Sequence, residues 1–304
     1  MTVRIGISGW RYAGWRGVFY PERLPQKREL EFASRAVDTI EINGSHYSLQ
    51  SARSYLSWYD STPENFAFSV KGPRYLTHML RFRDETARPA IANFFASGVL
   101  ALREKLAAFL WQFPPNFSFV PSSFDAFLAL LPSDFRSAAR LAHSHDTRVK
   151  DPWFDVRSNL RIRHAIEIRH PSFCVPEFVA MLRKYRAALV VSDATADWPY
   201  GEDVTSDFVY LRLHGSETLY SGAYSEAALE RLAARIDAWS QGREPSDAVR
   251  FSEKPATRRR SRDVLVYFDN DRKVEAPFDA ARLKARLRAP TPRTSVRRSA
   301  STIV

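Results

Sequence analysis

The sequence predicts an α/β protein that folds as one (β/α)8 barrel of the TIM type. At 304 residues, the chain has the length of a single barrel of this kind. Hydrophobic residues make up 45% of it and aromatic residues 13%, which suits a globular protein with a large apolar core. Eight short apolar runs follow one another, most of them separated by helix-like segments, and eight such units indicate a closed barrel.

Each apolar run is rich in Val, Ile and Phe and stops at a polar residue, Gly or Pro, as a buried strand does. In chain order the predicted strands are VRIGISGW from Val3, TIEING from Thr39, FAFSVKGP from Phe66, FLWQFPP from Phe109, HAIEIRHP from His164, ALVVSDA from Ala188, FVYLRLHG from Phe208 and VLVYFDN from Val264. The predicted helices cover residues 27–36, 51–58, 90–106, 123–131, 175–185, 225–239 and 279–287. Between the sixth and seventh strands, the short connection contains Pro and Gly, which argues against a full helix.

The barrel is expected to occupy residues 1–289, with inserts before the fifth and eighth strands. The first insert, residues 143–161, is polar but contains Trp153 and Phe154. The second insert, residues 250–262, contains the basic stretch EKPATRRRSR. Residues 290–304 form a basic tail without periodicity, which we expect to be disordered.

The formal net charge of +11 is concentrated in the second insert and near the C-terminal end of the sequence. Most of this excess comes from Lys254, Arg258, Arg259, Arg260, Arg262, Arg288, Arg293, Arg297 and Arg298. The charge therefore indicates a peripheral attraction to polyanions such as nucleic acid, and it says little about the barrel itself.

The single cysteine, Cys174, excludes an internal disulfide and any site built on several thiolates. The first residues lack the apolar stretch of a signal peptide, and no apolar run approaches the ~18 residues that cross a bilayer. We therefore expect a cytoplasmic protein without a membrane partner.

One face of the predicted strands carries polar side chains near the carboxyl end. Residues two apart on a strand share a face. The pairs on this face are Ser8 and Trp10, Glu41 and Asn43, Ser69 and Lys71, Leu110 and Gln112, Glu167 and Arg169, Val191 and Asp193, Arg212 and His214, and Tyr267 and Asp269. We expect this face to point into the barrel, at the end where barrel enzymes place their sites.

Glu167, Asp193 and His214 are the candidate catalytic residues, because carboxylates and imidazoles move protons. The candidate substrate-binding residues are Glu41, Asn43, Lys71, Gln112, Arg169, Arg212, Asp269 and Tyr224. The cations Lys71, Arg169 and Arg212 favour an anionic ligand. In the loop LYSGAYS, Tyr224 could stack on a sugar or base, or simply pack the loop. As an alternative, the charged residues pair with one another as a structural plug.

The same carboxylates and His214 can be drawn as a metal site, but the interleaved cations would repel a metal ion. We therefore predict no metal. The segment GISGW misses the G-x-S-x-G nucleophile elbow by one glycine, and the sequence contains no P-loop, H-E-x-x-H or G-x-G-x-x-G motif. We therefore predict no cofactor.

Seven blocks of this sequence resemble the signature segments of the YecE-like bacterial family, domain of unknown function 72. They are GISGWRYAGWRGVFYPERLP, TIEINGSHYSL, FSVKGPRYLTH, LWQFPPNF, AIEIRHPSF, FVYLRLHG with YSGAYS, and VYFDND. They extend from Ile5 to about Asp271. The resemblance implies an α/β barrel in a cytoplasmic bacterial protein and specifies no reaction.

The family's recurrent positions match Glu41, Asn43, Lys71, Gln112, Glu167, Arg169, His170, Asp193, Arg212, His214, Asp269 and Asn270. His46 stands where the family commonly has an aromatic residue, so a role for its imidazole would be particular to this subgroup. A comparison with barrel endonucleases and xylose isomerase-like enzymes rests on fold alone.

Three functional hypotheses follow. In the first, the barrel binds or processes a phosphate-bearing or other anionic small molecule at its carboxyl-terminal face. The second is a metal-dependent nucleic-acid hydrolase, and the third is a non-catalytic nucleic-acid-binding protein that uses the insert and tail. Hydrolase, lyase and isomerase chemistry all stay open, as does the oligomeric state.

Overall fold

In the computed structural model, eight parallel strands form one closed barrel in the order β1 to β8. The structure describes residues 1–80, 87–194, 198–215, 222–270 and 274–288. The strands are β1 (Val3–Ser8), β2 (Thr39–Ile42), β3 (Ala67–Lys71), β4 (Leu106–Gln112), β5 (His164–Glu167), β6 (Ala188–Asp193), β7 (Phe208–Leu213) and β8 (Asp263–Phe268). The barrel closes where β1 pairs in parallel with β8, with Ile5 opposite Val266. The predicted (β/α)8 fold is confirmed.

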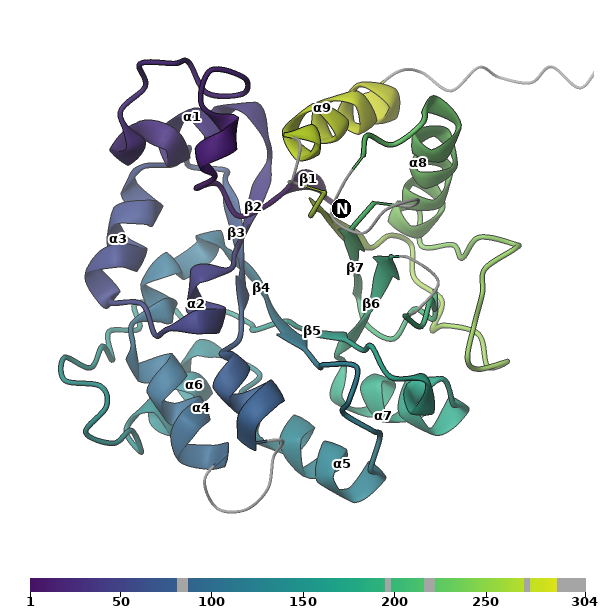
Figure 1. Ribbon diagram of the computed structural model, residues 1–304. Coiled ribbons are helices and arrows are strands. Elements are labelled where there is room, and N and C mark those ends of the chain that lie inside the picture. The colour runs from purple at the N-terminus through teal and green to yellow at the C-terminus, as the bar shows by residue number, and fades with distance from the viewer. Residues whose placement is uncertain (81–86, 195–197, 216–221, 271–273, 289–304) are drawn as a thin grey trace, which may run out of the picture.

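Helices surround the strands on the outside of the barrel (Figure 1). They are α1 (Glu29–Ala36), α2 (Gly44–Tyr47), α3 (Ala52–Asp60), α4 (Ala87–Ala96), α5 (Pro121–Leu130), α6 (Phe135–Ala142), α7 (Pro176–Tyr185), α8 (Glu226–Ser240) and α9 (Glu275–Arg288). Shorter helical turns are η1 (Ala13–Trp15), η2 (Gln26–Arg28), the π-helical η3 (Tyr75–Leu80), η4 (Val99–Lys105) and η5 (Pro171–Phe173). None of the helices that the structure describes is both long and apolar enough to pass through a membrane.

Two helix predictions need correction. The predicted helix 90–106 is interrupted at Gly98, whose φ of +102° is left-handed and whose Cβ position lies 2.5 Å from Ala52. The chain therefore breaks into α4 and η4, and β4 begins at Leu106. The helix α6 was not predicted, although it begins with a capping box between Asp134 and Ser137.

In its described residues, the connection between β6 and β7 agrees with its prediction. Between β6 and β7, the described residues form no helix, and Thr205 instead bonds through its hydroxyl to the backbone of Ala187 and Leu189. The first insert packs on α4, where the backbone N–H of Trp153 donates to the carbonyl of Ala96 (2.8 Å). The tail predicted for residues 290–304 lies outside the described residues.

Two apolar cores separate the inside of the barrel from its outside. The outer core packs Ile40, Ile166 and Leu211 against the helices, as predicted for the aliphatic face of the strands. The smaller inner core includes Leu110 and Tyr267. Its apolar side chains fill the lower part of the barrel, so polar side chains can gather only above it.

The prediction for the faces of β6 was wrong. Val191 belongs to the outer core and Val190 to the inner core, so Asp193 faces the helices and Ser192 the interior. The run ALVVSD is apolar on both faces until its last two residues, and these place one polar group on each face. Its pattern therefore could not decide which face points inward.

Candidate functional site

Charged and polar side chains form a ring above the inner core, which we call the polar ring. It consists of Glu41, Glu167, Arg169, Arg212, His214 and Asp269. Arg212 contacts the three carboxylates of this ring. Its Nη2 donates to Glu41 Oε1 (2.9 Å) and Asp269 Oδ2 (2.7 Å), and its Nη1 donates to Glu167 Oε2 (2.8 Å). Its Nε donates to the second oxygen of Glu41 (3.1 Å). Only 1% of Arg212 is exposed, so this buried charge is compensated within the barrel.

Neutral side chains complete the bonds of Glu41. Tyr210, two residues before Arg212 on β7, donates its hydroxyl to Glu41 Oε2 (2.6 Å). On β1, Ser8 donates to Glu41 Oε1 (2.7 Å) and accepts from the Asn43 amide (2.9 Å). Each oxygen of this fully buried carboxylate therefore accepts two hydrogen bonds, which fixes its position.

Arg169 and His214 approach the same ring from β5 and β7. Arg169 donates through Nε and Nη2 to Glu167 Oε1 (3.1 and 3.0 Å), and its guanidinium lies 3.6 Å from the centre of the Trp198 ring. His214 places Nδ1 3.0 Å from Asp269 Oδ2 and Nε2 3.3 Å from Arg212 Nη1. Both predicted anion-binding arginines are thus engaged with carboxylates.

The pKa values of the charged side chains in this ring are shifted by their ion pairs. Burial raises the pKa of a carboxyl group, yet Arg212 and Arg169 hold the pKa of Glu167 well below its usual value. Arg212, followed by His214, likewise lowers the pKa of Asp269 against the effect of burial. The pKa of Arg212 is raised well above its usual value, because the carboxylates outweigh the penalty of burial. Glu167 and Asp269 are therefore ionised at neutral pH and are weak bases.

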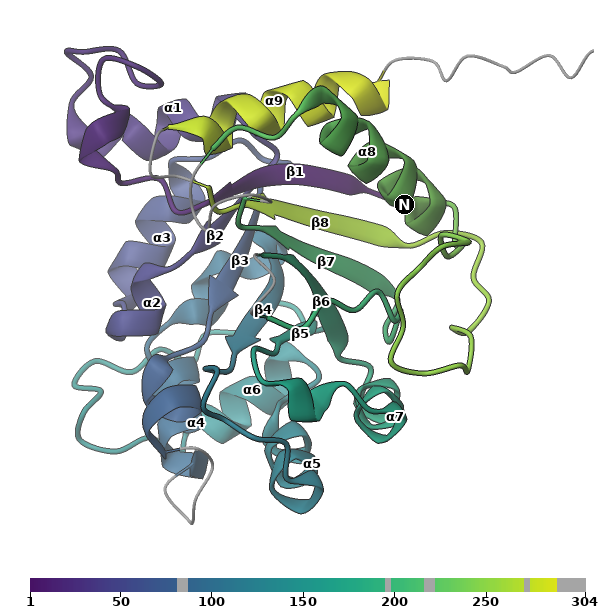
Figure 2. The same ribbon diagram turned by 45° about the vertical axis from the view of Figure 1, so that its right-hand side comes forward.

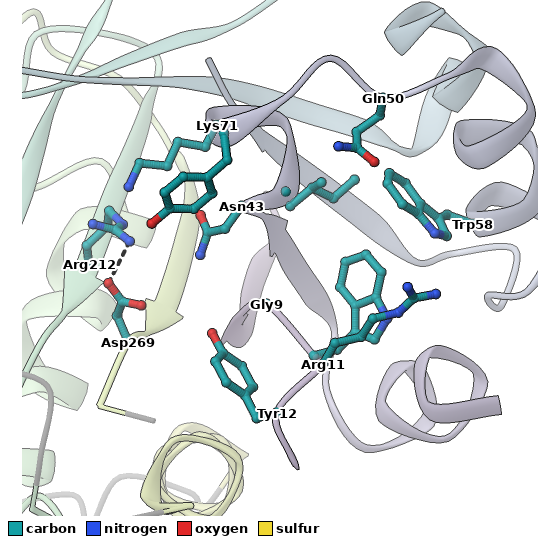
Figure 3. Close-up of a pocket in the computed structure, with 13 residues that line it drawn as sticks. Gly9, Arg11, Tyr12, Asn43, Gln50, Trp58, Lys71, Arg212 and Asp269 are labelled. Atoms are coloured by element: carbon teal, nitrogen blue, oxygen red, sulfur yellow. Dashed lines mark hydrogen bonds and ion pairs between the residues drawn. The ribbon is translucent and has the colours of Figure 1, made fainter. Parts of the chain in front are cut away.

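A cavity of about 520 Å³ lies over this ring at the carboxyl ends of β1, β2 and β3 (Figure 3). Its polar floor includes Asn43, Lys71, Arg212 and Asp269. Aromatic side chains surround the polar floor: Trp10, Tyr12, Tyr47 and Trp58. The size and the mixed lining are those of a small-molecule site.

The chain reaches the cavity through a turn at Gly9, directly after β1. Gly9 has a φ of +78°, and a Cβ at this position would lie 2.7 Å from the Tyr12 hydroxyl. Its N–H donates to the carbonyl of Glu41 (2.8 Å). This turn brings Trp10 to the cavity, where its ring contacts that of Trp58 edge to face, with centroids 5.3 Å apart.

Lys71, the last residue of β3, extends into the cavity beside Arg212 (Figure 3). It is 8% exposed, and within the described part of the chain its ammonium makes no hydrogen bond or ion pair. Burial, and next the charge of Arg212, lower the pKa of Lys71 to about 8, although Glu167, Glu41 and Asp269 act in the opposite direction. Among the described residues, Lys71 is therefore a buried cation of this site without an ion-pair partner, unlike Arg169 and Arg212.

Comparison with known proteins gives this chain a family. The model of the family described as "Protein of unknown function DUF72" matches residues 4–301. The chain belongs to the DUF72 family. The resemblance to YecE-like proteins is thereby confirmed, because that label is another name for the same family.

Solved DUF72 structures agree with the barrel. A DUF72 family protein of Thermotoga maritima is 26% identical, with a TM-score of 0.71 over 95% of this chain and 100% of the other. One from Enterococcus faecalis is 18% identical, with a TM-score of 0.67 over 95% and 97% of the two chains, and this likeness shows the fold alone. The UPF0759 protein YunF of Bacillus subtilis is 31% identical over 121 residues, which cover 38% of this chain and 41% of YunF.

Two of the predicted site residues of this DUF72 protein lie away from the cavity. Asp193 faces outward into a separate cavity of about 220 Å³ under α8, and burial raises the pKa of its carboxyl group. Tyr224 is 2% exposed, packs edge to face on Phe268 and accepts the N–H of Gly215 (3.0 Å). The structure therefore assigns Tyr224 to loop packing rather than to the cavity.

The other predicted residues fall into two groups. Asn43, Lys71, Arg212 and Asp269 line the cavity of this DUF72 protein. A second group lies around the ring and consists of Glu41, Gln112, Glu167 and His214, which are fully or almost fully buried, and Arg169, which is partly buried and pairs with Glu167. The structural-plug interpretation suits the second group and the paired side chains of Arg212 and Asp269, whereas Asn43 and Lys71 lie in the cavity outside this ion-pair network.

His46 and His78 form an imidazole pair beside Lys71. Their ring centroids are 5.1 Å apart, and His46 Nδ1 bonds to the carbonyl oxygen of Gly72 (2.9 Å). Burial, followed by the charge of Lys71, lowers the pKa of His46 to about 3 and that of His78 to about 4. Both rings are therefore neutral at physiological pH, and the sequence analysis did not find His78.

The described residues contain no group of three or more His, Cys, Asp or Glu side chains arranged to hold a metal ion. Tyr210 and the cavity residues Tyr47 and Trp58 were not among the predicted site residues. For Tyr210, the signal was present, because it shares the inward face of β7 with Arg212 at a spacing of two residues. Trp58 lies on α3 and carries no comparable signal.

Proposed function

We propose that this DUF72 protein binds and chemically processes a small organic molecule that carries a phosphate or other anionic group. The observation that carries the proposal is the ammonium of Lys71, which lies in the cavity without a carboxylate partner among the described residues. A buried ammonium gains most from an anion that approaches it in a site with little water. The anionic group would therefore contact Lys71.

The rest of the cavity lining suits the carbon skeleton of an organic anion. The indole rings of Trp10 and Trp58, together with Tyr12 and Tyr47, offer flat apolar surfaces of the kind that pack on a sugar ring or a base. The amide of Asn43 adds a polar group to the cavity floor. Arg212 would act mainly by holding the floor in place, since its donors already bind carboxylates.

A ligand screen with a matched pair of lysine variants tests this function. Thermal melting and calorimetry would be followed with inorganic phosphate, sugar phosphates and nucleotides. We expect at least one of these to stabilise the protein, and Lys71→Met to weaken its binding roughly tenfold or more, as the loss of a charged hydrogen bond does. The control is Lys254→Met, because Lys254 is exposed in the basic insert.

The proposal fails if none of these anions shifts the melting temperature. It fails equally if Lys71→Met and Lys254→Met bind the anion as tightly as the unchanged protein. Among the described residues, no three His, Cys, Asp or Glu side chains are arranged to hold a metal ion. No observation therefore favours the hypothesis of a metal-dependent nucleic-acid hydrolase.

A further inference from the structure

Two buried lysines of this chain differ sharply in their surroundings. Lys105, at the end of η4, is 4% exposed, and its Nζ donates to the carbonyls of Tyr59 (2.6 Å) and Thr62 (2.9 Å) and to the hydroxyl of Thr62 (3.2 Å). Lys71 is 8% exposed, but its Nζ lies in the cavity without a hydrogen bond to any described residue. Lys105 is held by its neighbours, whereas Lys71 presents its nitrogen to whatever enters the cavity.

The surroundings of Lys71 also favour its neutral amine. Burial and the neighbouring guanidinium of Arg212 bring its pKa to about 8. At pH 7, roughly a tenth of the molecules then carry a free electron pair on Nζ, some two-hundredfold more than for an ordinary exposed lysine. A desolvated lysine beside another cation is a recognised form of activated amine nucleophile.

We propose that Lys71 is a nucleophile that forms a Schiff base with the carbonyl group of an anionic aldehyde or ketone. This inference rests on the proposed function and deepens it, because it names the substrate class. The cavity brings together the needed parts: an accessible amine, aromatic walls for the carbon skeleton and a polar floor at Asn43 and Asp269. No cofactor is required.

The step balances without an external reagent. Nζ of the neutral amine attacks the carbonyl carbon, a C–N bond forms, and the carbonyl oxygen takes up a proton to give a carbinolamine. The C–O bond then breaks, and the oxygen leaves as water with a second proton. Overall, one ammonium and one carbonyl give one iminium and one water, and both protons of the water come from the ammonium. The positive charge stays on nitrogen, so the attraction to the anionic group of the substrate is retained.

Reductive trapping on the intact protein tests the proposal. The protein would be incubated with pyruvate or glycolaldehyde phosphate and sodium cyanoborohydride, and the modified lysines would be located by peptide mass spectrometry. Reduction of the iminium leaves a secondary amine that carries the mass of the carbonyl compound less one oxygen atom. We expect labelling of Lys71 about tenfold or more above that of any other lysine. Lys105 provides the internal control, because its amine is buried but engaged.

The pH dependence of trapping gives a second readout. The initial rate of labelling at Lys71 should rise as the pH is raised towards about 8, the pKa of its ammonium, and then level off. The charged and titratable groups that act on Lys71 from the surrounding elements are Arg212, Glu41, Glu167, Asp269, His46 and His78. Lys71→Arg removes the nucleophile, so the variant should lose the label at this position.

The outcomes separate this inference from the proposed function. Labelling of Lys71 that does not exceed labelling of exposed lysines with either compound overturns the Schiff-base inference. If phosphate still stabilises the protein through Lys71, the proposed anion binding survives. Acetone, a neutral ketone, provides the converse test: equal trapping of acetone and pyruvate keeps the nucleophile but overturns the preference for an anionic substrate.

Discussion

Arg212 forms ion pairs with three carboxylates, which lie at the carboxyl ends of three different strands. Glu41, Glu167 and Asp269 are all within 3 Å of its guanidinium nitrogens, and all four side chains are buried or nearly so. A buried pair of this kind adds little net stability over an apolar pair of the same shape. Removing one partner, however, leaves the other charge buried without a counter-charge, which is strongly destabilising. Arg212 is therefore more important to the fold than to the ligand.

We expect Arg212→Met to lower the free energy of unfolding by about 3–5 kcal/mol, because it leaves buried carboxylates without their counter-charge. Urea denaturation of the purified proteins measures the change. Arg161→Met is the matched control: Arg161 pairs with Asp207 at the surface, and its loss should cost only about 0–1 kcal/mol. Equal losses for the two variants would contradict the plug role of Arg212.

The difference between the unchanged protein and Arg212→Met should shrink in acid. The folded pKa values of Glu167 and Asp269 are lowered, so their contribution is present above their unfolded pKa values near ~4 and is lost as the pH falls through the folded values. In the variant, the buried carboxyl groups have no Arg212 beside them, so burial favours their protonated, neutral form. Acid therefore removes the cost of burying unpaired negative charges. Denaturation at pH 7 and at several pH values below 4 compares the two. A difference that stays constant over this range would show that the carboxylates are not responsible.

At the scale of single elements, β1 depends on a close approach to β2. Gly6 pairs with Thr39, and a Cβ built on Gly6 would lie 1.7 Å from the carbonyl oxygen of Thr39. Backbone atoms cannot move aside as a flexible side chain can, so any larger residue must displace one strand from the other. The register of β1 therefore depends on the absence of a side chain here.

We expect Gly6→Ala to destabilise the fold by about 3 kcal/mol or more and to lower the melting temperature clearly. Gly14→Ala is the control, because Gly14 is exposed and its added Cβ would meet nothing within 4 Å. That variant should change stability by no more than about 0.5 kcal/mol. Thermal denaturation of both variants measures the change in melting temperature, and urea denaturation measures the change in the free energy of unfolding. A Gly6→Ala protein as stable as the unchanged one would show that β1 can shift without cost.

Element boundaries were predicted from local signals, and this explains where the predictions failed. Strand positions were predicted well because apolar runs and their ends are local features. Gly98 ends α4 through a backbone conformation that depends on its contact with Ala52, which is far away in the sequence. The two faces of β6 have the same apolarity, so packing rather than pattern turned Asp193 outward.

At the scale of the whole molecule, the cavity and the basic insert lie at opposite ends of the barrel. The segment that leads into β8 lies beyond the amino ends of the strands, near the chain's N-terminus, whereas α2 and α3 mark the other end (Figure 2). Lys254, Arg258, Arg259 and Arg260 are exposed in this insert, while Arg262 is buried. A polyanion held by the insert would thus sit far from Lys71.

We therefore expect the two ends to behave independently. Replacing Lys254, Arg258, Arg259 and Arg260 by Ser should weaken binding to duplex DNA and reduce its dependence on salt, since fewer phosphate contacts are made. The stabilisation by small anions should stay as it is. DNA binding at several salt concentrations, together with thermal shifts, measures both effects. If small-anion binding falls in parallel, the separation of the two sites is wrong.

The sequence by itself determined the eight-stranded barrel, its order and the gathering of polar side chains at the carboxyl ends of the strands. These properties follow from hydrophobic periodicity, which is local along the chain. Only the tertiary structure decided which charges pair. Glu41 and Arg212 are 171 positions apart and meet because the barrel closes. Closure engages both arginines with carboxylates, and it leaves the ammonium of Lys71 in the cavity without a hydrogen bond to any described residue. Pairing depends on distances between residues far apart in the sequence, and only the closed barrel sets these distances.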